Sequence, residues 1–299
     1  MRAVSFSAYG DPSVLTVVES EVPEPGPGQV RVAVRAAGVN PIDVKVRSGQ
    51  LAQGEPLPAP RVPGLEVSGV VDAVGEGVTG TAVGDAVVGW AVGGYAEYAL
   101  SSTFAAKPEA LTWQEAASLP VAGEAAVRAL RVLAPQRGET LLVNGASGAV
   151  GGIAVQLAVA DGVTVVGTAG GANLDGVRAR GALATPYGEG LAQRVRALAP
   201  RGVDAVLDAA GHGVLPDAIA LRGGVDRIVT LADPAAFDLD VPFLSKAEDQ
   251  TVRTLDTLLT AAAEGRITPP ASRVMALDEA AEAHREWERK SSGKFVLVP

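Results

Sequence analysis

The chain has 299 residues, 47% of them hydrophobic and 20% charged, which is the composition of a folded protein with room for two domains. Its net charge of −9 is spread along the chain and argues against a nucleic-acid-binding protein, because such proteins cluster lysine and arginine against phosphates. Cysteine is absent and the two histidines, His212 and His284, are far apart in the sequence, which excludes disulfides and cysteine-ligated zinc and argues against a histidine metal cluster or a Ser-His-Asp hydrolase.

Short strands separated by tight turns fill the first third of the chain. Val30–Val34, Val67–Val74 and Asp85–Val88 are β-branched runs of strand length. Clusters rich in glycine and proline lie between them, for example at 21–29 and 74–80. This density of short strands and turns predicts a compact β-barrel.

The pattern becomes helical near Leu111. Thr112 is expected to cap a helix over Trp113–Ser118, with Glu115 completing a capping box. Further along, strands are expected at 138–145, 162–169, 183–187, 202–210 and 225–232, and helices at 148–160, 173–182, 190–199 and 214–222. Alternation at this spacing predicts a doubly wound parallel sheet with helices on both faces, so the fold class is α/β.

The remaining segments are predicted to be two helices, at 253–267 and 278–290, and a last strand at 294–298. No apolar run approaches the ~20 residues that a membrane helix needs. The first residues lack the long apolar stretch of a secretory signal. We therefore expect a cytoplasmic protein that does not bind a membrane.

A glycine-rich turn connects the strand at 138–145 to the helix that follows it. Gly145, Gly148 and Gly151 stand three residues apart. Glycine permits a tight bend and lets a pyrophosphate approach backbone amides, while the helix N-terminus supplies unpaired N–H groups and a positive dipole end. The position of this turn after an apolar strand predicts a dinucleotide site; the alternative is a tight turn that needs small residues for packing.

The choice between NAD and NADP depends on the end of the second strand. A carboxylate there would bind the 2′-hydroxyl of NAD, but residues 167–171 contain no acid. Arg178 and Arg180 follow shortly and could bind a 2′-phosphate, or they could be solvated helix charges. The pattern favours NADPH.

Several ordered blocks of sequence carry a family resemblance that spans nearly the whole chain. They are Gly38–Asp43 continuing to Arg47–Gly49, Pro63–Gly69, Gly94–Tyr98, Leu119–Gly123, the glycine turn and Gly293–Leu297. With these blocks, the chain resembles the zinc-free quinone oxidoreductase (zeta-crystallin-like) branch of the medium-chain dehydrogenase/reductase superfamily. The resemblance implies a GroES-like barrel over 1–119, completed by 268–299, and a Rossmann NADP(H)-binding domain over 120–267. It also implies a cleft between them for substrate and nicotinamide, and a homodimer.

The resemblance further implies which residues contact the cofactor. Zinc-using relatives have cysteine near Asn40 and histidine beside Glu66, where this chain has Asn40 and Leu65, so a zinc-independent reaction is expected. Carried over by position, the cofactor contacts are Asn40 near the nicotinamide, Ser147, Gly148, Ala149 and Val150 at the pyrophosphate, and Thr168 and Tyr187 near the adenosine phosphate.

Three departures from the family pattern bear on function. Many members have tyrosine where this chain has Lys45, and threonine where it has Ala125. Many also have lysine or arginine within the stretch aligned with Gly171–Asn173, and its absence weakens the inference of NADPH.

Hydride transfer needs a group that stabilises charge on the acceptor oxygen and a source of a proton. Asn40 can donate a neutral hydrogen bond, Lys45 can supply a cation or a proton, and Asp43 could orient either of them. Each has a structural alternative: Asn40-Pro41 is a common turn pair, Asp43 could cap a helical turn, and Lys45 alternates with valines as a solvated strand or turn residue would.

The two histidines are assigned minor roles. His212 follows Gly211 at the carboxyl end of a strand, where α/β sheets bind ligands, so Gly211 is included among the candidate cofactor contacts. A solvated loop is the simpler interpretation of His212. His284 is surrounded by charged residues and is expected to be exposed.

The leading hypothesis is an NADPH-dependent reductase of a quinone or an α,β-unsaturated carbonyl compound. The acceptor is a small molecule, and sequence cannot distinguish between these substrates, because acceptor choice depends on the shape of the pocket. Two alternatives stay open: a non-catalytic NADPH-binding redox sensor, and an enoyl reductase of a biosynthetic pathway.

Overall fold

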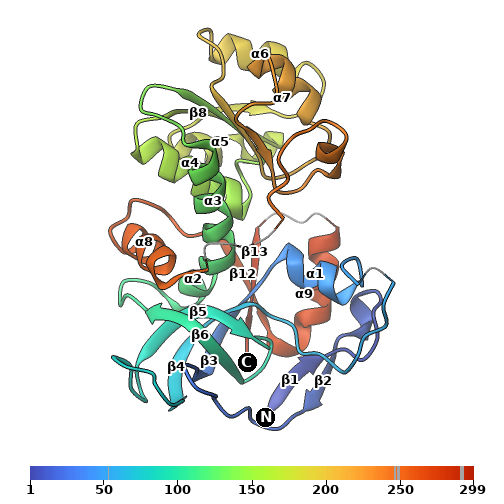
Figure 1. The fold of residues 1–299 in the computed structure, drawn as a ribbon, viewed down its shortest axis with the longest axis vertical. Helices are drawn as coiled ribbons and strands as arrows, with labels where there is room; N and C mark the ends of the chain where they lie inside the picture. The colour runs from blue at the N-terminus through green and yellow to red at the C-terminus, as the bar shows by residue number, and fades with distance from the viewer. Residues whose placement is uncertain (53, 246, 248–249, 290–292) are drawn as a thin grey trace. The chain divides into compact units, whose positions relative to one another are not determined.

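The computed structural model describes residues 1–52, 54–245, 247, 250–289 and 293–299. Contacts between Cα atoms divide the chain into two compact units, coloured by residue number in Figure 1. Unit 1 comprises 1–121, 250–263 and 269–299, and unit 2 comprises 122–249 and 264–268. The segment 250–263, expected in the dinucleotide-binding domain, has its contacts in unit 1.

Four strands of unit 1 form a closed barrel. β3 (Val30–Val39), β4 (Glu66–Val74), β5 (Ala86–Val92) and β6 (Tyr98–Ala106) pair antiparallel in sequence order, and β6 pairs back with β3. The alternating valines that predicted strand β3 point into the barrel core, as the burial of Val30, Val32 and Val34 shows. The predicted barrel is confirmed, and closure removes the exposed edges that open sheets leave.

The barrel sheet is extended by strands from the end of the chain. β13 (Lys294–Val298) pairs antiparallel with β3, and β12 (Ser272–Ala276) pairs parallel with β13. β1 (Arg2–Ser5) and β2 (Thr16–Glu19) form a separate antiparallel ribbon. The predicted last strand is therefore confirmed, and it begins 264 residues after the start of β3, the strand with which it pairs.

Among the described residues, the helices that lie wholly in unit 1 are α1 (Pro41–Arg47), α2 (Trp113–Ala117), α8 (Val252–Ala263) and α9 (Ala280–Glu288). The capping box at α2 is as expected, since the Thr112 hydroxyl accepts from the Glu115 N–H and the Glu115 carboxylate accepts from the Thr112 N–H. The predicted helix at 278–290 is observed to Glu288, and residue 290 lies outside the described residues. Short 3-10 turns occur at Pro12–Val14, Gly171–Asn173, Pro234–Phe237 and Leu277–Glu279.

The described residues of unit 2 form a parallel sheet of five strands in the order β11-β10-β7-β8-β9. The strands are β7 (Thr140–Asn144), β8 (Thr164–Ala169), β9 (Leu183–Pro186), β10 (Ala205–Asp208) and β11 (Ile228–Thr230). The chain moves outward from β7 to β8 and β9, then crosses to β10 on the other side of β7. The carboxyl ends of β7 and β10 therefore flank the point where the strand order reverses, which is where ligands bind in such sheets.

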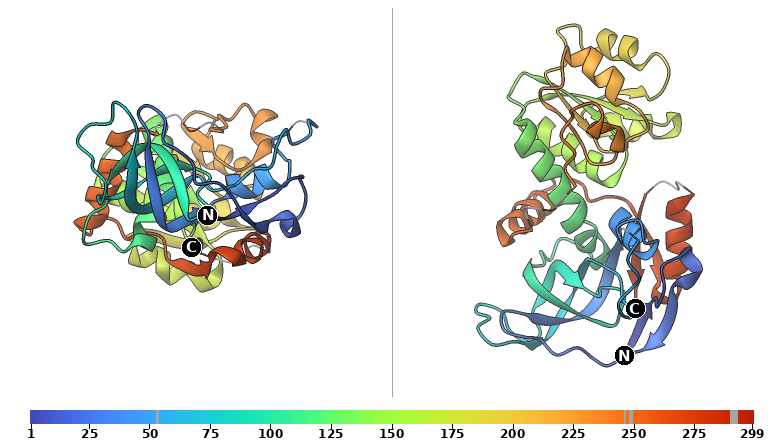
Figure 2. Two further views of the ribbon diagram at one scale, coloured as in Figure 1. Left: turned by 90° about the horizontal axis from the view of Figure 1, so that it is seen from below. Right: turned by 45° about the vertical axis from the view of Figure 1, so that its right-hand side comes forward.

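Helices cover both faces of this sheet, as Figure 1 and the right-hand view of Figure 2 show. α6 (Leu191–Leu198) and α7 (Leu215–Arg222) share a core with Val166, whereas the neighbouring Gly167 faces α5 (Leu174–Ala179). α4 (Ala149–Ala160) packs on β7 and β8, and α3 (Pro120–Leu133) precedes β7. The predicted doubly wound α/β arrangement is confirmed. None of the described helices combines the length and apolarity needed to cross a membrane.

Candidate active site

The glycine turn of unit 2 connects β7 to α4 with hardly any side-chain bulk. Gly145 adopts a left-handed conformation (φ +82°), and its carbonyl accepts from the Gly148 N–H at 3.0 Å. Gly148 is the N-cap of the 12-residue α4 and has no side chain to cap the helix. The first amides of α4, from Ala149 onward, are therefore left for an external acceptor, which is the arrangement that binds an anion.

Close packing explains the last glycine of the turn. A Cβ atom at Gly151 would lie 2.2 Å from the carbonyl oxygen of Gly145, so any side chain there would push the turn away from the helix. At Gly148, by contrast, a Cβ atom would lie 3.3 Å from the same oxygen, and the position is exposed. Ser147, Ala149 and Val150 are half-buried around the turn. The structure thus places the predicted pyrophosphate residues at the end of this turn and in the first residues of α4.

A series of buried polar side chains, joined by hydrogen bonds, lies next to the glycine turn and holds it in place. The Thr168 hydroxyl donates to Asn144 Oδ1 at 2.6 Å and accepts from the Gly145 N–H at 3.2 Å. Asn144 Nδ2 donates to Asp208 Oδ1 at 2.8 Å, and Asp208 Oδ2 accepts from the Thr230 hydroxyl at 2.7 Å. Asn144, Asp208 and Thr230 are the last residues of β7, β10 and β11, and Thr168 is one residue from the end of β8, so hydrogen bonds cross-link the carboxyl edge of the sheet.

The same hydrogen-bonded side chains also hold the loop that follows β10. Asp208 also accepts from the N–H groups of Ala210 and Gly211, and Asn144 donates to the Gly211 carbonyl at 3.0 Å. Thr168, expected as a contact of the adenosine phosphate, is fully buried beneath the turn with its hydroxyl engaged there. His212 is exposed in the loop that follows Gly211, with a left-handed backbone (φ +63°).

The region after β8 carries the residues proposed to distinguish NADP from NAD. Arg178 is exposed on α5 and forms an ion pair with Asp175 at 2.6 Å. Tyr187 is exposed beside Gly170, where an added Cβ atom would lie 3.7 Å from the tyrosine hydroxyl. Arg180 lies instead against α4 at Gly152, and its burial lowers its pKa. Of these three side chains, Arg178 and Tyr187 are therefore exposed, whereas Arg180 is half-buried.

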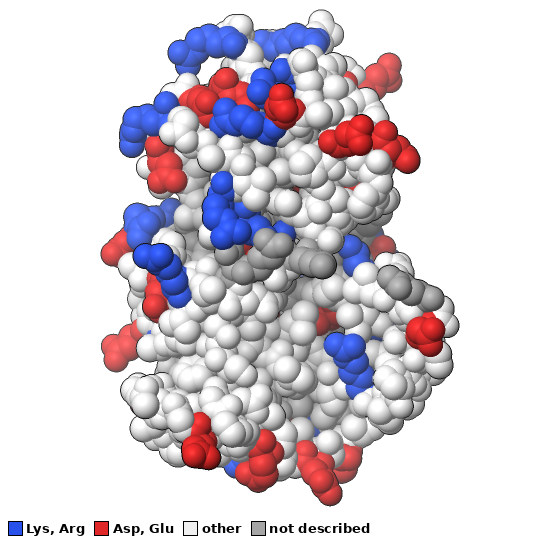
Figure 3. All heavy atoms as spheres, in the orientation of Figure 1, with Lys and Arg blue, Asp and Glu red and all other residues white. Residues whose placement is uncertain are grey.

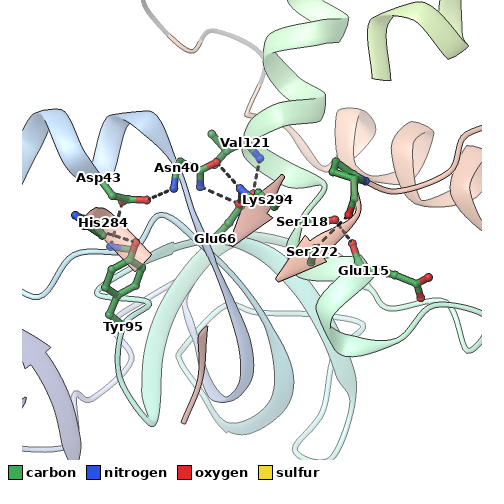
Figure 4. Close-up of polar contacts among 12 residues, drawn as sticks. Asn40, Asp43, Glu66, Tyr95, Glu115, Ser118, Val121, Ser272, His284 and Lys294 are labelled. Carbon is green, nitrogen blue, oxygen red and sulfur yellow. Dashed lines mark hydrogen bonds and ion pairs between the residues drawn. The ribbon is translucent and has the colours of Figure 1, made fainter. Parts of the chain in front are cut away.

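The polar site of unit 1 is a buried cluster built on Asn40, Glu66 and Lys294 (Figure 4). Asn40 Nδ2 donates to Glu66 Oε1 at 2.8 Å. The Lys294 ammonium donates to Asn40 Oδ1 and to Glu66 Oε1, each at 2.5 Å. Glu66 Oε2 accepts from the N–H of Val121, in the first turn of α3, at 2.7 Å. Every charge in the cluster thus has a partner, as burial requires.

Asp43 fixes the backbone of the same site. Its Oδ2 accepts from the Asn40 N–H at 2.8 Å, and its Oδ1 accepts from the Gly64 N–H at 3.3 Å. Burial raises the pKa of the Asp43 carboxyl to about 7, although the hydrogen bond from Asn40 and the Lys294 charge lower it. The interpretation of Asp43 as a helix cap agrees with its contact to the Asn40 N–H.

Tyr95 and His284 form a second buried pair next to Asp43. The Tyr95 hydroxyl and His284 Nε2 are 3.2 Å apart, and the rings meet edge to face. The prediction that His284 is exposed is wrong: it lies on the same face of α9 as Ala280 and Ala283, which packs into the barrel core. Burial and the Arg47 guanidinium lower the pKa of His284 to about 3, so the ring is neutral. Burial raises the pKa of Tyr95, with further contributions from the nearby Asp43 and Glu66 carboxylates.

Lys45 is the catalytic candidate that does not join these clusters. It lies half-buried within helix α1, so its interpretation as a strand or turn residue is wrong. Among the described residues, no hydrogen bond or ion pair joins its ammonium to another group, and Asp43 accepts a hydrogen bond from the Asn40 backbone instead. Of the three candidates, the structure brings Asn40 and Asp43 together.

Sequence reasoning missed Glu66 and Lys294 in unit 1, and Asn144, Asp208 and Thr230 in unit 2. Glu66 and Lys294 each begin a largely apolar strand, and Asn144 and Asp208 each end one. A polar residue at the boundary of a buried strand was therefore the available signal. It could not reveal the partners, because 228 residues separate Glu66 from Lys294.

Comparisons with known proteins agree with this architecture. The family model of the alcohol dehydrogenase GroES-like domain matches residues 26–108, and that of the zinc-binding dehydrogenase matches 182–297. A quinone oxidoreductase from Lama guanicoe is 30% identical over 323 residues, covering 100% of this chain and 97% of the relative.

Two solved structures are similar over the full length. A mycobacterial protein complexed with NADPH is 31% identical, with a TM-score of 0.86 and 100% of both chains covered. A structure described as an NAD-dependent alcohol dehydrogenase is 33% identical, with a TM-score of 0.88 and 100% of both chains covered. With its barrel, its doubly wound sheet and this full-length relationship, the chain belongs to the quinone oxidoreductase branch of the medium-chain dehydrogenase/reductase superfamily.

Proposed function

We propose that this protein is an NADPH-dependent oxidoreductase that transfers hydride, without zinc, to a quinone or an α,β-unsaturated carbonyl compound. The observation that carries the proposal is the bare turn from Gly145 to Gly151. It presents the free amides at the start of α4, next to the point where the strand order of a parallel sheet reverses.

The residues of unit 2 fit a dinucleotide. The turn has no side chain that would fill the space of a pyrophosphate, and Gly148 provides an exposed N-cap with no capping group of its own. Arg178 and Tyr187 are available to a 2′-phosphate beyond β8, where no carboxylate ends the strand. The complex of the mycobacterial relative with NADPH supports the same cofactor. NADPH, when bound, supplies the hydride.

The residues of unit 1 are suited to stabilise a substrate oxygen atom that gains negative charge during hydride transfer. Asn40 offers an N–H group, and Asp43 can hold a proton near neutral pH. A reaction without zinc is supported by the lack of cysteine in the chain and by the Lys294 ammonium. That cation lies against both Asn40 and Glu66, where it compensates the buried carboxylate.

Steady-state oxidation of NADPH, compared with NADH, tests this function. The acceptors should be 1,4-benzoquinone, an enal, a cyclic enone and an enoyl thioester. We expect turnover with NADPH and one of the first three acceptors. Turnover confined to the enoyl thioester would favour a biosynthetic enoyl reductase, and tight NADPH binding without turnover would favour a redox sensor. A preference for NADH would refute the cofactor assignment.

The variant Gly148→Asp tests the cofactor site separately. The backbone at Gly148 is extended (φ −74°, ψ 173°), and aspartate is a favourable N-cap there, so the helix should remain stable. The added carboxylate would face the pyrophosphate, and we expect NADPH affinity to fall by at least about a hundredfold. Gly148→Ser, an uncharged N-cap, is the matched control. Unchanged NADPH affinity in the aspartate variant would refute the site.

The assembly and the partners complete the proposal. We propose a homodimer, because β11 is an edge strand of the unit 2 sheet and edge strands can pair with a second chain. β11 pairs with β10 on one side, and on its other side the described residues provide an isolated bridge from Thr230 to Phe243. Light scattering during gel filtration tests this. On the face shown in Figure 3, the basic side chains lie in several separate groups and form no single large patch, which opposes a nucleic acid as the partner.

A further inference from the structure

Three buried side chains of unit 1 form a closed ring of hydrogen bonds, and Figure 4 shows them converging from separate elements. Asn40 precedes α1, Glu66 begins β4 and Lys294 begins β13. The three contacts, from Asn40 Nδ2 to Glu66, from Lys294 to Asn40 Oδ1 and from Lys294 to Glu66, measure 2.8, 2.5 and 2.5 Å. Each member therefore touches both of the others.

The chemistry of the two partners decides which way the Asn40 amide faces. An ammonium only donates, so the Asn40 atom against Lys294 must be Oδ1. A carboxylate only accepts, so the atom against Glu66 must be Nδ2. Turning the amide over would place N–H groups against the ammonium and an oxygen against the carboxylate, and it would lose both hydrogen bonds.

Glu66 is itself held in place. Its second oxygen accepts from the Val121 N–H at 2.7 Å. Gly38 makes room for the carboxylate, because a Cβ atom at that position would lie 2.0 Å from Glu66 Oε1. The Asn40 backbone is fixed independently by Asp43, which accepts from its N–H at 2.8 Å. Both ends of Asn40 are thus constrained.

We propose that Glu66 and Lys294 are positioning residues that hold Asn40 as a hydrogen-bond donor, so that its second Nδ2 hydrogen binds an oxygen atom of the ligand. Nδ2 carries two hydrogens, and among the described residues only Glu66 accepts one of them. The ligand atom is a carbonyl-type oxygen, which the acceptor substrate and the carboxamide of the cofactor both contain. The inference rests on the proposed function.

A double-mutant cycle between Lys294→Met and Asn40→Ala tests the positioning role. Two quantities are measured for all four proteins: the dissociation constant of NADPH, by fluorescence, and kcat/KM with 1,4-benzoquinone. We expect each single variant to lose about ten- to a hundredfold in one of them, the effect of one hydrogen bond. If Lys294 acts through Asn40, Lys294→Met causes no further loss in the Asn40→Ala background.

The outcomes separate the possible sources of the oxygen. Coupling in the dissociation constant assigns the oxygen to the cofactor, whereas coupling in kcat/KM alone assigns it to the substrate. Independent losses in both quantities would overturn the proposal, because Lys294 would then act without Asn40. A wild-type protein that binds NADPH but turns over no acceptor would refute the proposed function, and the binding cycle would still decide the role of Lys294.

A second set of variants allows for the cost of an unpaired buried charge. Lys294→Met leaves Glu66 without its cation, and this variant could unfold. The combination of Glu66→Gln with Lys294→Met removes both charges and keeps an oxygen for Asn40 Nδ2, although the Val121 N–H loses its acceptor. It should still unfold cooperatively in urea, at a lower concentration than the wild type, and show the loss in activity. Full activity in this folded variant would also overturn the proposal.

Discussion

Two adjacent glycines of α4 allow the cofactor turn to be tested with a matched pair of variants. Gly151 and Gly152 are both helical, so replacement of either by alanine gains about 1 kcal/mol of helix propensity. They differ in what the added methyl meets. At Gly151 it would lie 2.2 Å from the Gly145 carbonyl oxygen, whereas at Gly152 it would lie 3.3 Å from the flexible end of Arg180.

The two variants should therefore change stability in opposite directions. Gly152→Ala should raise the free energy of unfolding by up to about 1 kcal/mol, since the arginine can move. Gly151→Ala must displace the turn backbone, and overpacking of this kind costs about 1–3 kcal/mol. We expect the two variants to differ by about 1–3 kcal/mol in urea unfolding monitored by circular dichroism.

The two variants should also differ in cofactor affinity. Displacement of the turn moves the amides that face the pyrophosphate, and loss of one charge-assisted hydrogen bond weakens binding about ten- to a hundredfold. Fluorescence titration should show this loss for Gly151→Ala and wild-type NADPH affinity for Gly152→Ala. Equal stability and equal affinity in the two variants would refute the packing argument.

Three further predictions concern other parts of the molecule. Asp208→Asn should lower the free energy of unfolding by about 1–3 kcal/mol and weaken NADPH binding, because an amide N–H group would face the Thr230 hydroxyl, which donates to Asp208 in the native protein. Thr230→Ser, which keeps the hydroxyl, should be close to the wild type in both quantities. His284 is neutral in the folded state with a pKa of about 3, so its contribution to stability is complete above its unfolded pKa of about 6.5 and is lost as the pH falls. When the pH is lowered from 7.5 to 5, the free energy of unfolding measured in urea should therefore fall by about 2 kcal/mol less for His284→Gln than for the wild type. An equal fall in both proteins would contradict the buried, neutral ring. Arg178→Ala should weaken NADPH binding and leave NADH binding unchanged, because the exposed guanidinium is free to exchange Asp175 for a 2′-phosphate; equal effects on the two cofactors would exclude that role.

The sequence was sufficient to predict the features that depend on local patterns. Alternation of apolar strands with helices predicted the parallel sheet, and the glycine spacing predicted the turn after β7, because both are written within a few residues. The capping box at Thr112 followed for the same reason.

Features that depend on partners distant in the chain could not be predicted. Asn144 and Asp208 are 64 residues apart and meet only because β7 and β10 are neighbours in the sheet. His284 was misjudged because charged neighbours suggested an exposed helix, whereas the side chain lies on the buried face with Ala280 and Ala283. Helix periodicity outweighs the polarity of adjacent residues, since adjacent residues point in different directions.

The strand β13 has a consequence for the order in which this chain acquires its structure during synthesis. A ribosome produces β3 to β6 first, then the whole of unit 2, and only afterwards the strand that carries Lys294. Until that strand pairs with β3, the Glu66 carboxylate lacks its cation, so a nascent barrel would contain an uncompensated charge. Unit 1, whose barrel strands are translated first, therefore completes its native structure only after unit 2 has been synthesised.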